Sequence, residues 1–199
     1  MLVFVFDITN IFESDLQNAI DVLSETEKYR LENMISVKRR KEFILGHFLL
    51  RKVLCHFFNV DIEKARIESL QTGALHLPNM QGVFASISHT AEKLAIAIGK
   101  TPVGIDIEKM SPRDNFPGLL NQIDSMDVAK ELVASGMSVQ NAFYHLWCKK
   151  EALYKLNSQT TAQIPFLFYH RYKDFMMCVA CKEEEPIEWI VKEIGDFNV

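Results

Sequence analysis

The sequence predicts an α+β fold made of two similar lobes, each with helices packed on a small, mostly antiparallel sheet. The prediction comes from the order of the expected elements. After an opening strand, helical segments precede strand-like segments in residues 1–101, and the same order recurs in residues 102–199. No low-complexity linker separates the halves, so we expect tightly packed lobes related by a pseudo-twofold axis.

The composition is that of a soluble globular protein with a sizeable core. Of the 199 residues, 48% are hydrophobic and 24% are charged. The net charge of −4 argues against general binding to nucleic acid. A basic run at residues 38–41 still offers a local patch that can hold a phosphorylated small molecule.

Cysteine usage and the apolar runs argue against several other classes. Cys178 and Cys181 have half of a zinc-knuckle spacing without a second half, so buried apolar thiols are the better interpretation, and no disulfide framework is indicated. Residues 1–10 indicate a strand rather than a signal peptide, and no apolar run approaches the roughly 20 residues that span a bilayer. We therefore expect a cytoplasmic protein that does not bind membranes.

Capping residues mark the expected helices of the first half. Ser14 with Gln17, and Ser24 with Glu27, have the spacing of capping boxes, and each box predicts the start of a helix. A broad apolar face then predicts one long helix over residues 36–58, with the basic run near its start.

The second half has the same kinds of signal. Gly136 is expected to end a helix over residues 125–135, and Ser138 to cap a helix that runs to about Leu156. Residues 111–118 are expected to form a loop. Across the whole chain, alternating apolar residues between turn signals predict strands at residues 65–70, 83–88, 93–99, 102–108, 164–170, 174–181 and 187–192.

The strand at residues 102–108 carries an unusual acidic pair. Its apolar residues alternate and predict a buried face, which leaves Asp106 and Glu108 together on the opposite face. Two carboxylates whose backbones are roughly 6.5–7 Å apart repel each other. A positive group is therefore expected between them.

The second long helix offers groups that complete such a site. Trp147, Glu151 and Lys155 are four residues apart and share one face. For this helix alone, a solvated Glu–Lys pair beside a core tryptophan is the simpler interpretation, worth about 0.2–0.5 kcal/mol. Together with Asp106 and Glu108, Glu151 supplies a third carboxylate, and such a set without His or Cys suits Mg²⁺ or Mn²⁺.

Cationic and hydroxyl side chains are available to bind phosphate. Lys150, Lys155 and the basic run are candidates to neutralise phosphate charge. Ser88 and His89 are candidate donors to phosphate oxygens, although a lone histidine is more commonly a core or turn residue bonded to backbone. For His47, helical spacing alone suggests that it faces the same phosphates.

Three stretches together resemble the 4′-phosphopantetheinyl transferase superfamily. They are SISHT at residues 86–90, GIDIE at 104–108 and WCKKEALYK at 147–155. The last stretch fits the family pattern W-x-x-K-E-[AS]-x-x-K at every specified position, and GIDIE fits G-[IVC]-D-[ILV]-E. The resemblance spans about residues 24–181 and implies that superfamily's fold. Length and two-lobed order are similar to the monomeric type represented by the surfactin-synthetase activator.

The resemblance implies a reaction and a role for each matching residue. Family members transfer the 4′-phosphopantetheine arm of coenzyme A to a serine of an apo acyl or peptidyl carrier protein and release 3′,5′-ADP. Asp106, Glu108 and Glu151 are then expected to hold Mg²⁺. Glu151 is also expected to be the catalytic base, and Lys155 to contact and protonate the leaving phosphate. Coenzyme A is expected to bind through cations and hydroxyls, at Lys28, Arg30, Arg40, Ser88, His89, Lys150 and Lys155.

The chain departs from the family pattern in two places. Many members have Gly-Lys-Pro upstream of the SISHT stretch, where residues 73–75 are Gly-Ala-Leu, and His47 replaces an arginine of the long helix. A non-catalytic relative that binds coenzyme A or a carrier protein is therefore the second hypothesis. Fatty-acid, polyketide and nonribosomal-peptide carriers all remain open. The carrier is expected near residues 112–140, at exposed apolar residues such as Phe116, Leu119 and Met126.

Overall fold

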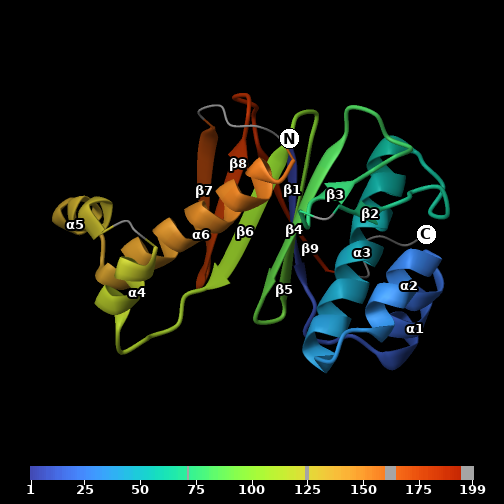
Figure 1. The fold of residues 1–199 in the computed structure, drawn as a ribbon, viewed down its shortest axis with the longest axis horizontal. Helices are drawn as coiled ribbons and strands as arrows, with labels where there is room; N and C mark the ends of the chain where they lie inside the picture. Colours follow the sequence, from blue (N-terminus) through green and yellow to red (C-terminus); the bar gives the residue numbers. More distant parts are fainter. Residues whose placement is uncertain (71, 124–125, 160–164, 194–199) are drawn as a thin grey trace.

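Two sheets lie face to face at the centre of the computed structural model, and helices cover their outer faces (Figure 1). This arrangement confirms the predicted α+β class with small, mostly antiparallel sheets. The structure describes residues 1–70, 72–123, 126–159 and 165–193. The predicted element ends at residues 125 and 164, and the part of the second lobe at 194–199, lie outside the described residues.

The elements follow the predicted order closely. The first half contains β1 (Leu2–Asp7), α1 (Glu13–Asp21), α2 (Glu25–Glu32), α3 (Val37–Phe58), β2 (Glu68–Ser69), β3 (Leu75–His76), β4 (Phe84–Thr90) and β5 (Lys93–Gly99). The second half contains β6 (Val103–Lys109), α4 (Phe116–Gln122), α5 (Met126–Ala134), α6 (Val139–Asn157), β7 (Phe166–Tyr172), β8 (Phe175–Cys181) and β9 (Glu188–Glu193).

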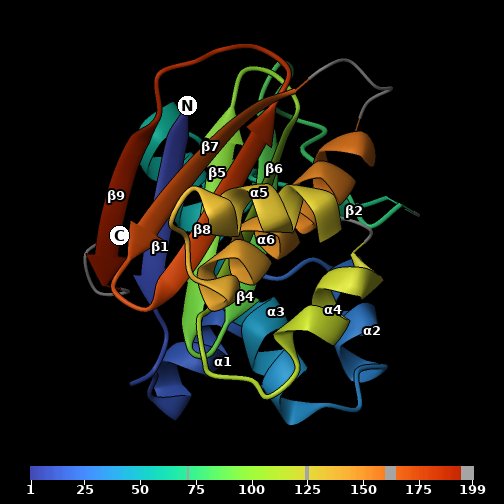
Figure 2. The same ribbon diagram turned by 90° about the vertical axis from the view of Figure 1, so that its left-hand side faces the viewer.

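The larger sheet combines strands from both ends of the chain. Its order is β4-β5-β1-β9, in which β9 runs parallel to β1 and the other pairs are antiparallel. The second sheet, β6-β8-β7, is antiparallel throughout, and β2 pairs with β3 separately. Because β9 crosses back to the first sheet (Figure 2), the two halves share a strand layer, and a lobe boundary at residues 101/102 stays a prediction.

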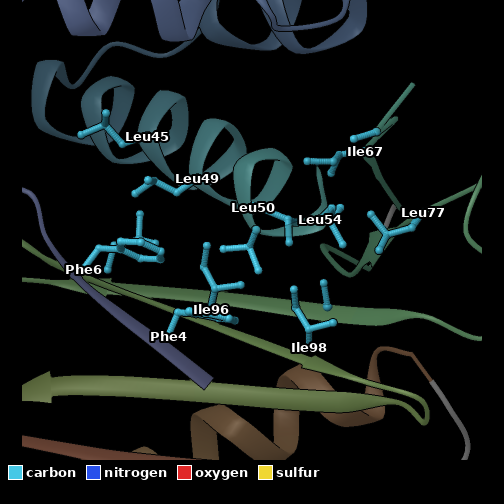
Figure 3. Packing of buried hydrophobic residues seen from close by; sticks show 14 of the residues in the cluster. Phe4, Phe6, Leu45, Leu49, Leu50, Leu54, Ile67, Leu77, Ile96 and Ile98 are labelled. Atoms are coloured by element: carbon cyan, nitrogen blue, oxygen red, sulfur yellow. The ribbon is translucent and has the colours of Figure 1, made fainter. Parts of the chain in front are cut away.

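Helix α3 covers the outer face of the larger sheet. Every second residue of β1 and β5 points toward this helix. The contact is made by leucines of α3 above aromatic and branched side chains of the strands (Figure 3), namely Leu45, Leu49, Leu50 and Leu54 above Phe4, Phe6, Ile96 and Ile98. The intervening strand residues face the second sheet and form a core between the sheets, which includes Val3, Val5, Ile105, Ile107 and Val179.

Helix α6 covers the second sheet in the same way. Its apolar residues Tyr144, Cys148, Ala152 and Leu156 pack on Cys178 and Ala180 of β8. Cys178 and Cys181 are free and buried, as predicted for apolar thiols. Because Ile105 and Ile107 face the other sheet, the polar positions of β6 face α6. The alternation seen in the sequence thus determines which side of the sheet carries the acidic pair.

The helix starts test the predicted caps. Ser24 and Glu27 form the predicted capping box, and the Ser138 side chain accepts a hydrogen bond from Asn141 N. The predicted box at Ser14 is wrong: α1 begins at Glu13, with Phe12 as its N-cap and no side-chain cap bond. Ser14 is therefore already inside the first helical turn, where its hydroxyl cannot serve as the cap.

The connections differ more from the predictions. Residues 116–118 were expected in a loop but begin α4, where Gly118 N donates to Asn115 Oδ1 at 3.0 Å. The expected strand at 65–70 is paired only at Glu68–Ser69. Apolar residues expected to be exposed are partly buried instead and pack on the α6 core: Phe116, Leu119 and Met126. Among the described residues, no helix has the length and apolar character needed to cross a membrane.

Candidate functional site between β6 and α6

Close packing between β6 and α6 creates the candidate site. A Cβ built on Gly104 would lie 2.0 Å from Ala152 O and 2.6 Å from Leu156 N, so only glycine permits this approach of helix to strand. Asp106 follows two residues later on the same face of β6. Lys155, on the adjoining turn of α6, is thereby brought to the strand.

The positive group expected beside the acidic pair is the Lys155 ammonium. Lys155 Nζ donates to Asp106 Oδ1 at 3.1 Å and to Ile105 O at 2.8 Å. Ser88 Oγ donates to the same Asp106 oxygen at 2.8 Å. The second oxygen, Asp106 Oδ2, is buried and has no hydrogen-bond partner among the described atoms. Asp106 thus keeps one acceptor for a further positive group.

Glu108 lies one strand repeat further along, beside Thr90. Thr90 Oγ1 donates to Glu108 Oε2 at 3.4 Å. Burial and the charge of Asp106 raise the pKa of Glu108, and hydrogen bonds from Trp147 and Thr90 oppose this shift. The acidic pair therefore repels, as the sequence predicted, and a cation placed near it would relieve the repulsion.

The hydroxyls of β4 follow the polar edge of β6. Ser86 Oγ accepts a hydrogen bond from Ile105 N at 3.2 Å, and Ser88 and Thr90 bond to the two carboxylates. These three residues alternate along β4 and face β6. Ser88, predicted to bind coenzyme A, directs its hydroxyl to Asp106 in this structure.

A cavity of about 470 Å³ lies beside this cluster, between α3, β4 and the C-terminal half of α6. Its wall includes five residues singled out from the sequence: Arg30, His47, His89, Glu151 and Lys155. Residues 73–75, where the chain lacks the family's Gly-Lys-Pro, also line it. Both departures from the family pattern therefore fall on one cavity, whose size suits a small-molecule ligand.

The three predicted metal ligands divide between the cluster and the cavity. Glu151 lines the cavity, whereas Asp106 and Glu108 lie on β6 next to it. Across the described residues, no group of three or more His, Cys, Asp or Glu side chains is arranged to hold a metal ion. The three-carboxylate site stays a prediction. The acidic pair itself fits Mg²⁺, since it offers hard oxygen donors and a buried, unpartnered Asp106 Oδ2.

Four predicted coenzyme A ligands lie outside the cavity wall, namely Ser88, described above, and Lys28, Arg40 and Lys150. Arg40 Nη1 donates to Leu31 O at 2.9 Å and so ties α2 to α3. Lys28 pairs with Glu25 at 3.3 Å, and Lys150 Nζ lies 5.8 Å from the centre of the Trp147 ring. Their roles in binding stay predictions.

The cavity also contains residues that the sequence reasoning missed. Arg39, rather than Arg40, lines it together with Phe43 and Gly46, and these three positions share one face of α3. Helical spacing therefore distinguishes Arg39, which lies on the same face of α3 as Phe43 and Gly46, from Arg40, which does not. On α6 the same spacing connects Glu151 with Tyr154 and Ser158. Gln159 had no such signal, because it follows the helix. Its side-chain amide accepts a hydrogen bond from Val103 N and donates one to Val103 O.

A buried charge network supports one side of the cavity. Glu27 lies between His47 Nδ1, 2.5 Å away, and Arg51, whose Nη1 donates to the carboxylate at 3.0 Å. Burial tends to raise the pKa of Glu27, but hydrogen bonds from His47, Arg51 and Ser24 outweigh it and lower the pKa to about 2. Burial lowers the pKa of His47 despite its contact with Glu27. The network joins α2 to α3 behind the cavity wall.

Comparisons with known proteins agree with these motifs. Residues 102–190 match a family model described as the 4′-phosphopantetheinyl transferase superfamily. The chain is 27% identical over 146 residues to the 4′-phosphopantetheinyl transferase ffp of Bacillus subtilis, covering 67% of this chain and 64% of that protein. It is 25% identical over 162 residues to psf-1 of Bacillus pumilus, covering 75% and 69%.

A third relative extends the range of organisms. The chain is 27% identical over 128 residues to the 4′-phosphopantetheinyl transferase AcpT of Salmonella typhimurium, covering 63% of each protein. The matches to ffp and AcpT span less than two thirds of those relatives' own length. The matched residues contain GIDIE and WCKKEALYK, and the structure brings Asp106 and Lys155 of these stretches into contact. Over residues 102–190 the chain is similar to the 4′-phosphopantetheinyl transferase superfamily, and each of the three relatives is named as a 4′-phosphopantetheinyl transferase.

Proposed function

We propose that the protein transfers the 4′-phosphopantetheine arm of coenzyme A to a serine of an apo acyl or peptidyl carrier protein and releases 3′,5′-ADP. The observation that carries the proposal is the Lys155–Asp106 contact next to a cavity walled by Arg30, Arg39 and His89. Cations around a cavity of this size suit a ligand with several phosphates. The names of the relatives support the same reaction.

Lys155 is the proposed contact to the reacting phosphate. An ammonium group has three donors, and Ile105 O and Asp106 Oδ1 accept two of them. The third donor is then available for a phosphate oxygen of coenzyme A. Charge neutralisation and positioning are the main requirements of phosphoryl transfer. Lys155 also supplies the proton to the leaving phosphate.

Glu151 is the proposed base, one turn before Lys155 on the same helix and in the cavity wall. It accepts the proton of the carrier serine, directly or through a water molecule, as the serine oxygen bonds to phosphorus and the bond to 3′,5′-ADP breaks. Asp106 and Glu108, with Glu151, are the residues proposed to hold Mg²⁺. When bound, that ion neutralises pyrophosphate charge as a Lewis acid.

A transfer assay with Glu151→Ala tests the proposal. Wild-type protein incubated with coenzyme A, Mg²⁺ and a panel of apo carriers is expected to add the mass of one phosphopantetheine arm to at least one carrier. Glu151→Ala is expected to lose this activity and keep its far-ultraviolet circular dichroism spectrum. Glu183→Gln, at an exposed loop position, serves as the matched control and retains activity.

The outcome also separates the two hypotheses from the sequence. A wild-type protein that binds coenzyme A but modifies no carrier supports the non-catalytic relative and contradicts the transferase. Normal transfer by Glu151→Ala contradicts only the role proposed for Glu151 and leaves the transferase proposal in place. We also propose that the protein acts in the cytoplasm as a monomer, without nucleic acid or membrane partners.

A further inference from the structure

Two acidic side chains, Glu42 and Glu151, lie in a cavity wall whose other charged groups are cationic, and the proposed function gives a role to Glu151 only. Glu42, on α3, lines the cavity with Arg30, Arg39 and Lys155. Its side chain is only 7% exposed. A carboxylate in this place repels the phosphates proposed to bind there, so its position calls for a role other than direct contact with them.

The packing of α3 on β4 places Glu42 against His89. Gly46, one turn after Glu42, lies close to β4, because a Cβ built there would be 3.4 Å from Ile87 Cγ2. Ile87 and His89 are two residues apart in β4 and share a face. The turn of α3 before Gly46 therefore faces His89, and Glu42 Oε2 lies 3.2 Å from His89 Nδ1.

This contact engages one ring nitrogen of His89 and leaves the other for a ligand. With Nδ1–H facing the carboxylate, Nε2 of the neutral ring carries no hydrogen, so Nε2 becomes a donor in the imidazolium form of His89, which also lines the cavity. The surrounding charges come from two helices: Glu42 and Lys38 on α3, and Lys155 and Glu151 on α6. Burial lowers the pKa of His89, the Glu42 carboxylate opposes that shift, and the charges of Lys155 and Lys38 add to it.

We propose that Glu42 is a positioning residue: it holds His89 through Nδ1 and stabilises the imidazolium form, whose Nε2–H points into the cavity toward a phosphate of coenzyme A. The identity of that ligand rests on the proposed function, whereas the contact between Glu42 and His89 does not. Glu42 acts through His89 and does not touch the substrate.

A double-mutant cycle tests this dependence. Glu42→Ala is expected to lower kcat/KM for coenzyme A about 10-fold to 100-fold, mainly through KM, because the phosphate donor loses its orientation. Glu42→Gln retains an oxygen and is expected to lose less. In a His89→Ala background, Glu42→Ala is expected to cause no further loss. The proposal is overturned if Glu42→Ala lowers kcat/KM as much in the His89→Ala background as in the wild-type background. It is also overturned if Glu42→Ala binds coenzyme A more tightly than the wild type does.

A second measurement does not depend on transfer. Histidine side-chain NMR of the full chain, with His89→Ala used for assignment, is expected to give a lower pKa for His89 in Glu42→Ala than in wild type. Glu32→Ala, at an exposed position of α2, should leave the His89 pKa unchanged. An unchanged His89 pKa in folded Glu42→Ala overturns the positioning role. Absence of transfer by wild type overturns the proposed function alone.

Discussion

The sequence motif around Ser88 indicated a functional site, but it did not predict which atom the Ser88 hydroxyl contacts. The SISHT stretch marked it as a ligand of coenzyme A, but its hydroxyl donates to Asp106 Oδ1 at 2.8 Å. A motif identifies which residues gather at a site. Which atoms meet depends on the register between β4 and β6, two strands that are not paired in a common sheet.

Under the proposed function, Ser88→Ala is therefore expected to affect Mg²⁺ binding more than coenzyme A binding. Loss of the hydroxyl leaves Asp106 less well oriented, and such supporting contacts are typically worth 10-fold to 100-fold in metal affinity. We expect the Mg²⁺ concentration for half-maximal transfer to rise about 10-fold, with a smaller change in KM for coenzyme A. Ser14→Ala is the matched control, since Ser14 makes no helix-cap bond. A raised KM with unchanged Mg²⁺ dependence would favour the role first predicted.

Glu27 makes the free energy of unfolding depend on pH in the acidic range. Its pKa falls from 4.5 to about 2 in the folded protein, so its contribution is complete above pH 4.5 and is lost as the pH falls toward 2. The lowered pKa of buried His47 acts in the same direction, because the unfolded chain takes up that proton more readily. Acid is thus expected to loosen the α2–α3 side of the cavity first.

Glu27→Gln is expected to lower the free energy of unfolding at pH 7 by about 3–5 kcal/mol, because it leaves Arg51 buried without its partner. Urea titrations at pH 7 and pH 3 measure the effect. The gap between wild type and variant should narrow at pH 3. Glu25→Gln, whose side chain is 92% exposed, is the control and should change little. A gap that stays constant with pH would contradict the linkage.

At the scale of elements, the position of α6 on β6 depends on one glycine. A methyl group on Gly104 meets the backbone of α6, which cannot rotate away as a side chain can. Gly46 of α3 provides the contrast, because its nearest contacts are side chains of Ile87 and Leu94 at 3.4 Å. The two helices occupy equivalent places in the two halves, but only α6 requires a glycine beneath it.

Gly104→Ala is expected to destabilise the fold by about 1–3 kcal/mol or more and to displace Lys155 from Asp106. Gly46→Ala should be neutral or stabilising by up to about 1 kcal/mol, since alanine is the better helix former. Chemical denaturation compares the two variants. Equal stabilities would show that α6 can move away from β6 without cost.

Local signals predicted most elements and failed where two signals compete. The Ser24 and Ser138 caps were found because polar caps directly precede apolar periodicity. The start of α4 was missed because Pro117 and Gly118 suggest a turn, although Asn115 before them is also a common cap. At the site, the sequence stretches named Asp106 and Lys155, which are in contact in the structure, whereas the presence of Arg39 rather than Arg40 in the cavity wall depends on the orientation of α3.

For the whole molecule, the return of β9 to β1 is the feature that the sequence did not indicate. Residues 187–192 were predicted as a strand, but alternation says nothing about the partner. The structure pairs Val3 with Trp189 and Val5 with Val191 in parallel register. Parallel pairing between strands so far apart in sequence is set by the packing of the complete chain.

A chain that ends at Pro186 is expected to be less stable and prone to aggregate, because β1 becomes an edge strand. Thermal melting and light scattering measure both effects against a chain that ends at Glu193, which keeps all of β9. A truncated chain with unchanged melting temperature would show that β9 contributes nothing to the larger sheet.

The shared strand layer also decides how the protein can be divided. Cutting the backbone between residues 101 and 102 leaves an N-terminal fragment whose β1 lacks β9 and a C-terminal fragment whose β9 lacks a neighbour. Neither piece holds the complete larger sheet, and Asp106 is separated from Ser88. Coexpressed pieces should therefore reassemble with one another, which makes the shared strand layer a suitable place to split the protein into two fragments.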